Sequence, residues 1–252
     1  MSNRKNALFT LIFSVILLSI SCAKKTFYGY NNPRDQFQAA LQLYQKGHYE
    51  RAIQQFRDLM YRFPRSDYVE KAQFYIAMSY LKEKDYDSAI NEFRFLIENY
   101  PNTEHTEEAV YRIIEAYYLK SLPPDRDQTD TKNALRLAKE FLAKYPNSEF
   151  ADDVRQIITR CRDKLAMKML IAVETFLKLE KYKSAQIYLD LFQQEYGDTQ
   201  EKWLAEYYQA KLYSLNGEKE KALELLQSLL NNPEVPPRVR AKAGSLYWKL
   251  AA

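Results

Sequence analysis

The chain is poor in the residues that most often build metal centres and catalytic sites. It has only two histidines, His48 and His105, and they lie far apart in the sequence, which disfavours a metal site or catalytic triad. Its two cysteines, Cys22 and Cys161, are too few for a disulfide scaffold or a cysteine-rich zinc site. A glycine-rich phosphate-binding loop is also absent from the sequence. The sequence therefore predicts no metal, no cofactor and no enzymatic activity.

Glycine and proline are scarce as well, with 5 and 9 of them in 252 residues. This scarcity argues against many tight hairpins and favours long helices. Hydrophobic residues make up 46% of the chain and charged residues 28%, which is typical of a globular protein and not of a disordered one. With 21 tyrosines and 13 phenylalanines, much of the packing is expected to be aromatic.

The N-terminus has the pattern of a targeting signal. Arg4 and Lys5 precede an uncharged, mostly apolar run of 14 residues, Ala7 to Ile20. As a helix this run is about 21 Å long, shorter than the ~30 Å hydrocarbon core of a bilayer. We therefore predict a signal peptide over residues 1–21 and not a membrane span.

Cys22 directly follows this apolar run and resembles the lipidated cysteine of a bacterial lipobox. The leucine that usually stands three residues before that cysteine is replaced by Ser19, so an ordinary signal peptide with an incidental cysteine remains the alternative. Ala23 resembles the sorting pattern of lipoproteins sent to the outer membrane. The resemblance implies a lipid anchor at Cys22, a tether over residues 22–32 and a periplasm-facing protein at the outer membrane.

Charge disfavours nucleic acid as a partner. Loss of residues 1–21 removes two cations and lowers the formal net charge from +4 to +2. This bias is too small for nucleic-acid binding, and no dense basic stripe with interleaved aromatics occurs. Cys161 loses its only possible intramolecular partner if Cys22 is acylated, so we predict that it is a small buried residue in a helix.

Four short phrases divide the rest of the chain into units. Each has an aromatic residue, then proline or glycine, then any residue, then serine or threonine: residues 63–66 (FPRS), 100–103 (YPNT), 145–148 (YPNS) and 196–199 (YGDT). The proline or glycine is expected to end one helix, and the hydroxyl residue to cap the next. The steps of 37, 45 and 51 residues between these prolines and the glycine indicate a helical-hairpin repeat with insertions.

These units resemble the tetratricopeptide repeat. The second unit matches best, with Ala77, Tyr80, Ala89, Phe93 and Pro101. The resemblance implies an all-α, right-handed superhelical solenoid of about five helix pairs over residues 33–250. We also expect an insertion at residues 121–131, an extended helix at about 151–180, and a helix at about 237–250 that covers the open end.

In that family the first helix of each pair lines a concave groove. Carried over position by position, the predicted groove residues are Phe37, Leu41, Tyr44, Lys71, Phe74, Met78, Leu81, Glu108, Tyr111, Glu115 and Tyr118. Such a groove suits an extended peptide with an aromatic end. Aromatics at these spacings also suit packing between neighbouring repeats, and this alternative stays open.

Three longer phrases resemble the BamD family, the repeat lipoproteins of the outer-membrane β-barrel assembly machine. They are residues 44–52 (YQKGHYERA), 63–68 (FPRSDY) and 72–80 (AQFYIAMSY). The resemblance implies that residues 33–150 bind the C-terminal signals of unfolded outer membrane proteins. It also implies that residues 151–252 dock on a BamA-like barrel subunit with periplasmic domains.

Arg238 and Arg240 are the candidate docking residues, and solvated surface is the alternative for both. Charge reversal there is predicted to weaken binding to the barrel subunit without unfolding the protein. A different function is also open, namely a periplasmic repeat lipoprotein that coordinates envelope constriction or peptidoglycan synthesis. A glycan-binding nutrient lipoprotein is disfavoured, because only Trp203 and Trp248 are available as sugar platforms.

Overall fold

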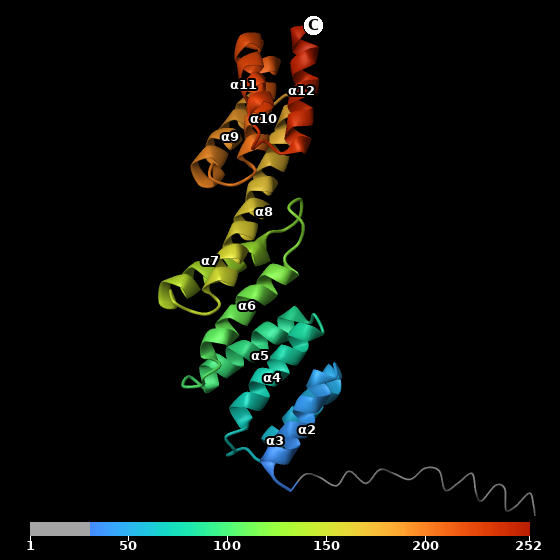
Figure 1. The fold of residues 1–252 in the computed structure, drawn as a ribbon, viewed down its shortest axis with the longest axis vertical. Helices are drawn as coiled ribbons and strands as arrows, with labels where there is room; N and C mark the ends of the chain where they lie inside the picture. Colours follow the sequence, from blue (N-terminus) through green and yellow to red (C-terminus); the bar gives the residue numbers. More distant parts are fainter. Residues whose placement is uncertain (1–30) are drawn as a thin grey trace, which may run out of the picture.

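The computed structural model describes residues 31–252 as an elongated stack of helices (Figure 1). The predicted signal peptide, Cys22 and the tether up to residue 30 lie outside these described residues. Within them the chain forms eleven helices and no strand. In chain order these are α2 (Pro33–Gln45), α3 (Tyr49–Arg62), α4 (Val69–Lys82), α5 (Tyr86–Asn99), α6 (Thr106–Lys120), α7 (Thr129–Lys144), α8 (Ala151–Lys178), α9 (Tyr182–Tyr196), α10 (Lys202–Leu215), α11 (Lys219–Asn231) and α12 (Pro237–Ala251).

Consecutive helices form five pairs, α2/α3 to α10/α11, and α12 closes the stack. Each helix packs on the next in the chain, and the first helices of neighbouring pairs also contact one another: α2 with α4, α6 with α8 and α8 with α10. Val239 and Ala243 of α12 cover Ala210, Leu226 and Leu229 of the last pair. The predicted all-α solenoid with about five helix pairs and a covering terminal helix is confirmed.

The same turn joins the two helices in four of the five pairs. Gly47, Lys84, Glu180 and Gly217 lie at equivalent places, with φ of 78°, 63°, 57° and 81°. This left-handed conformation reverses the chain within a few residues and lets the second helix pack back on the first. In the third pair the insertion replaces the turn. It covers residues 121–128, because the first turn of α7 already begins at Thr129.

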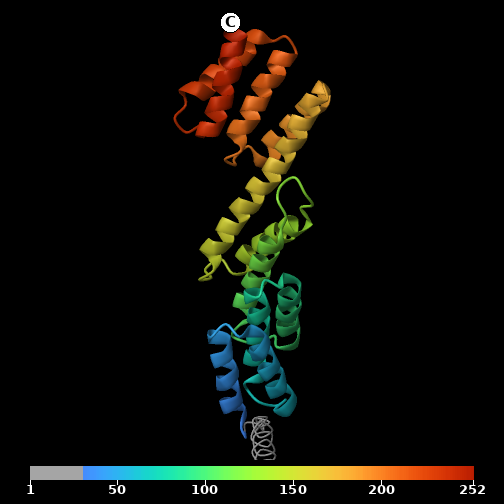
Figure 2. The same cartoon turned by 90° about the vertical axis from the view of Figure 1, so that its right-hand side faces the viewer.

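The long helix α8, yellow in Figure 2, runs between the two halves of the stack. It belongs to two hydrophobic cores. Val154, Ile157 and Cys161 pack with α6 and α7, whereas Ala166 and Leu170 pack with α9 and α10. The packing partner therefore changes inside α8, and not at residue 150 where we divide the chain by function. Cys161 is fully buried, as predicted, and burial raises the pKa of its thiol to about 11.

The capping role predicted for the repeated hydroxyl residues is wrong. Ser66 Oγ accepts a hydrogen bond from the Tyr68 backbone N–H at 3.2 Å, and Ser148 Oγ accepts one from the Phe150 N–H at 3.1 Å. These bonds close a turn that lies before the helix, and helices α4 and α8 begin one residue after it without a side-chain cap.

None of the helices in residues 31–252 is long and apolar enough to cross a membrane.

Candidate binding surfaces

Five of the predicted groove residues are buried, and the expectation that they line an open groove is wrong. Phe37, Phe74, Met78, Leu81 and Tyr111 are only 5–8% exposed. They complete the contacts between neighbouring helix pairs, so the alternative of packing between repeats is correct for them.

Ring contacts show why these side chains are inaccessible. Phe37 lies 5.6 Å from Phe56 and 5.1 Å from Tyr68, between ring centroids. Phe74 is covered by the His105 imidazole, whose ring stacks on it at 4.3 Å. Repeated aromatics therefore form the interfaces between helix pairs, which spacing alone does not distinguish from a groove lining.

The half-exposed members of the predicted groove remain available as a surface, and Tyr44 lies at one end of it. Tyr44 lies in the last turn of α2, with its ring 5.2 Å from that of Tyr75 on α4. Its pKa is raised, chiefly by burial and then by Tyr49 and Tyr75, with smaller effects from Arg112 and Glu108 on α6. The charges in the first half of α6 therefore lie within electrostatic range of the Tyr44 hydroxyl at the end of α2. Leu41, one turn earlier on α2, packs against the same core with its side chain half-buried.

Arg112 is a central residue of this surface that the sequence analysis missed. Its guanidinium lies 2.9 Å from Glu108 Oε1 and 3.0 Å from Glu115 Oε2, over the ring of Tyr111. Burial lowers its pKa, but hydrogen bonds to Glu108 and Glu115 outweigh burial and raise it overall. The spacing of three and four residues between these charges was the signal that marks one helix face.

Tyr118 and Lys71 lie at the two margins of the predicted groove. Tyr118, two turns beyond Tyr111 on α6, has its ring 5.2 Å from Lys164 Nζ of α8, and that ammonium donates to Ser121 Oγ at 2.6 Å. Lys71 pairs with Glu104 at 3.2 Å, at the turn between α5 and α6. The surface that remains therefore runs from Tyr44 over the α6 charges to Tyr118.

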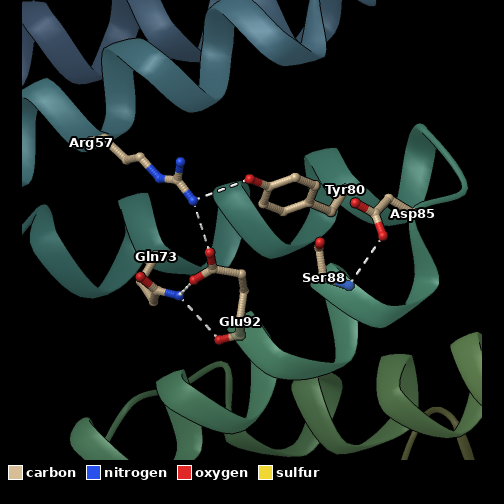
Figure 3. A network of polar contacts seen from close by, with 6 residues as sticks. All are labelled: Arg57, Gln73, Tyr80, Asp85, Ser88 and Glu92. Carbon is tan, nitrogen blue, oxygen red and sulfur yellow. Dashed lines mark hydrogen bonds and ion pairs between the residues drawn. The ribbon is translucent and has the colours of Figure 1, made fainter.

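A polar network joins the first two helix pairs (Figure 3). The Arg57 guanidinium of α3 donates to the Tyr80 hydroxyl at 3.1 Å and to Glu92 Oε1 at 3.0 Å. Buried Gln73 donates to Glu92 Oε2 at 2.7 Å and to the Glu92 carbonyl at 3.1 Å. These bonds link α3, α4 and α5.

The network recurs one repeat along. Arg94 donates to the Tyr117 hydroxyl at 2.9 Å, across the same 23 residues that separate Arg57 from Tyr80. One repeat earlier, the fully buried Gln36 side chain donates to the Gln55 carbonyl at 3.4 Å. This bond is equivalent to the one from Gln73 to the Glu92 carbonyl. Equivalent hydrogen bonds therefore recur 37 residues apart, at the spacing of the sequence repeat. These polar residues stabilise the packing of the helices.

A cavity of about 410 Å³ lies between α8, α10 and α12. Arg238 and Lys242 line it from α12, Glu174 from α8, Glu201 from the residue before α10 and Tyr208 from the middle of α10. Lys178 donates to Glu174 and lowers its pKa, whereas burial raises the pKa of Glu201. The exposed Arg238 makes no ion pair within 4 Å among the described residues.

Arg240 does not fit the docking role predicted for it. Its Nη2 donates to the carbonyls of Asn232, Pro233 and Val235 at 3.0, 3.1 and 3.1 Å. The side chain points back into the turn before α12 and holds that turn closed. Charge reversal at Arg240 would break this turn, so the predicted double charge reversal is no clean test of docking.

The insertion at 121–128 is fixed from inside and from α8. The buried Gln128 side chain donates to the carbonyls of Leu122, Pro123 and Arg126. Lys168 of α8 donates to the Arg126 carbonyl at 2.7 Å. The loop thereby forms one wall of a second hollow, of about 440 Å³, between α8 and α9.

In the described part of the chain no group of three or more His, Cys, Asp or Glu side chains is placed to hold a metal ion.

Comparison with known proteins places the chain in one family. A family model described as YfiO, outer membrane lipoprotein, matches residues 30–227. No curated protein matches the sequence. Similar solved structures include a thermophilic tetratricopeptide-repeat protein of Thermus thermophilus, at 18% identity, 85% coverage of this chain, 98% of that one and a TM-score of 0.37. A tetratricopeptide-repeat protein of Parabacteroides merdae is 12% identical, with coverages of 87% and 89% and a TM-score of 0.39.

Proposed function

The chain belongs to the YfiO family of outer membrane lipoproteins, and from this premise we propose that it is a non-enzymatic scaffold of the outer-membrane β-barrel assembly machine. The observation that carries the proposal is the family match over residues 30–227, which agrees with the resemblance to BamD. In this function the protein holds a barrel subunit and the unfolded barrel proteins close together, and no covalent step is needed.

The proposal assigns the N-terminus to membrane attachment. Acylation of Cys22 anchors the protein, Ala23 directs it to the outer membrane, and the helix pairs face the periplasm. Several acyl chains, at ~0.8 kcal/mol for each buried CH₂, hold a protein firmly on a membrane. Replacement of Cys22 by alanine should release the protein from the membrane fraction, which a fractionation experiment measures.

The proposal assigns the two ends of the stack to different partners. The region from α8 to α12 docks on a periplasmic domain of a BamA-like subunit, and exposed Arg238 offers a cation for an acidic partner residue. The surface from Tyr44 to Tyr118 binds the aromatic C-terminal signal of an unfolded outer membrane protein. Half-buried tyrosines suit this contact, since they present apolar area with little conformational freedom to lose.

The decisive experiment is a pull-down of the tagged protein from its native membranes in mild detergent, with bound proteins identified by mass spectrometry. A large β-barrel protein with repeated periplasmic domains is expected as the main partner. Recovery of cell-wall synthesis or constriction proteins instead, without a barrel subunit, would overturn the proposal and favour the alternative function in envelope constriction.

A peptide-binding assay tests the client surface separately. A labelled peptide that ends in phenylalanine should bind the protein, and Tyr44→Ala with Tyr118→Ala should weaken that binding about tenfold or more, as expected for loss of two aromatic contacts. Tyr61→Ala is the matched control, because Tyr61 lies on α3 and is 88% exposed. Equal affinities of the double variant and the control would remove this surface from the proposal.

A further inference from the structure

The terminal helix α12 carries positive charge only. Between Pro237 and Ala251 it contains two arginines and two lysines and no acidic residue. Arg240 is occupied by the turn carbonyls. The other three cations, Arg238, Lys242 and Lys249, make no ion pair within 4 Å in residues 31–252. The family match ends at residue 227, so α12 lies beyond the part of the chain that the family model describes.

These three cations line two adjacent hollows that share Lys242, together called the α12 groove. Arg238 and Lys242 belong to the cavity of about 410 Å³ between α8, α10 and α12. Lys242 and Lys249 belong to a neighbouring, more open hollow of about 400 Å³, beside Tyr207 and Leu246 and distinct from the one between α8 and α9. Lys242 is shared by both, with its Nζ 5.7 Å from the Tyr207 ring centroid and 5.8 Å from that of Tyr208. Basic side chains of α12 and tyrosine rings of α10 therefore line the groove together.

The acidic residues of the groove do not cancel this charge. Glu174 is paired with Lys178 at 3.0 Å, a cation outside the lining of the cavity, and Lys242 also lowers its pKa electrostatically, so the three cations of the groove face two carboxyl groups. Glu201 lies near Arg238 and is half-buried, and burial disfavours its charged form. The groove therefore keeps a positive excess, centred on Lys242 and Lys249 at the end away from Glu201.

We propose that this groove binds an extended peptide segment of a partner protein that carries several Asp or Glu residues. This inference goes beyond the scaffold function and does not depend on which protein presents the segment. From Arg238 to Lys249 the α12 axis is about 16 Å long, which an extended chain spans with about five residues. In a polyproline II segment, which rises about 3.1 Å per residue, the steps between the cations, about 6 Å and 10 Å, match acidic residues at positions i, i+2 and i+5. The three-residue period of that conformation places i+2 and i+5 on the same face.

The concave shape favours a peptide over a membrane surface. The cavity at Arg238 and Lys242 lies between three helices, where a single chain is enclosed, whereas a flat bilayer contacts convex faces. The hollow at Lys249 is more open and continues along α12. Arg240 also ties the start of α12 to its preceding turn, so Arg238 and Lys242 are held in place before binding. Such preorganisation lowers the entropy that binding must offset.

The test uses the full chain in mild detergent and two fluorescent peptides, measured by anisotropy at low and high salt. One peptide has glutamates at i, i+2 and i+5, and the other has glutamines there. The acidic peptide should bind at least tenfold more tightly, and Arg238→Gln, Lys242→Gln and Lys249→Gln combined should weaken its binding about tenfold, the sum of three exposed charge pairs.

A variant with the same change in net charge is the control. Lys46→Gln, Lys82→Gln and Lys139→Gln remove three exposed cations elsewhere and should change the affinity less than twofold. Equal loss in both triple variants, or equal binding of both peptides, overturns the proposal. It is also overturned if the groove triple loses binding to anionic phosphatidylglycerol vesicles while its peptide affinity is unchanged, which would assign the surface to lipid. Lys242→Glu alone, checked by its thermal melt, replaces the triple if that variant fails to fold.

Discussion

Lys84 and Glu180 have a backbone conformation that their side chains disfavour. Both have positive φ, at the turn position that Gly47 and Gly217 occupy in the first and last pairs. A residue with a Cβ in this region costs about 1–2 kcal/mol relative to its usual conformation. Both side chains are exposed, so the repeated turn geometry, and not a side-chain contact, holds this conformation.

We therefore expect Lys84→Gly and Glu180→Gly each to raise the free energy of unfolding by about 0.5 kcal/mol, since relief of the Cβ conflict exceeds the extra chain entropy of glycine. Gly217→Ala should lower it by about 1 kcal/mol. No atom lies within 4 Å of the added Cβ, so only backbone conformation contributes. Urea unfolding measures all three. Destabilisation by both glycine substitutions would contradict the argument.

At the residue scale the sequence shows which positions repeat an aromatic side chain, but it did not predict which of these side chains are exposed. Phe37 and Phe74 recur at the 37-residue step, as expected of a groove and equally of an interface between pairs. The choice depends on what covers each ring, and the His105 imidazole that covers Phe74 comes from the following turn. Contacts of this kind need the path of the chain, which a periodic pattern does not contain.

Among the elements, α12 depends most on one side chain. Arg240 supplies three hydrogen bonds to the turn over residues 232–235, and Val235 and Val239 then cover the last pair. The helix itself was predictable, because its apolar residues recur at steps of three and four. The role of Arg240 was not, since it follows from three carbonyls that converge in the turn.

Arg240→Met should destabilise the protein by about 2 kcal/mol, because it leaves the half-buried Val235 carbonyl without its Arg240 partner and removes one hydrogen bond each from the Asn232 and Pro233 carbonyls. The loss should be local, with faster amide hydrogen exchange in residues 239–251 than in α2 to α6. Arg238→Met is the matched control and should change stability by less than about 0.5 kcal/mol, because the Arg238 side chain is exposed. Equal destabilisation by the two substitutions would refute the distinction between them.

For the whole molecule, α8 is the element on which cooperativity depends. It supplies Val154 and Cys161 to one core and Ala166 and Leu170 to the next. The sequence predicted its length, since no helix breaker occurs in the segment, but not the change of packing partner. Its apolar stripe continues unbroken through both cores, so the pattern gives no sign of the boundary.

Asp163→Pro should separate the unfolding of the two halves. Proline at this position removes a helical hydrogen bond and costs about 3 kcal/mol. Trp203 and Trp248, the two tryptophans of the chain, both lie in the C-terminal half, so their fluorescence follows that half and far-ultraviolet circular dichroism follows the whole. The two denaturation curves should coincide in the wild type and in Asp163→Asn, and diverge in Asp163→Pro. Coincident curves in all three proteins would show that α8 does not couple the halves.

The same helix sets a geometric relation between the two ends of the molecule. Its 28 residues extend about 42 Å, and both of its halves are packed into a core. Four residues inserted between Cys161 and Ala166 would lengthen it by about 6 Å and turn one half by about 40° against the other. Partners bound at opposite ends are therefore kept at one separation and one rotational phase, and a change in helix length alters both together.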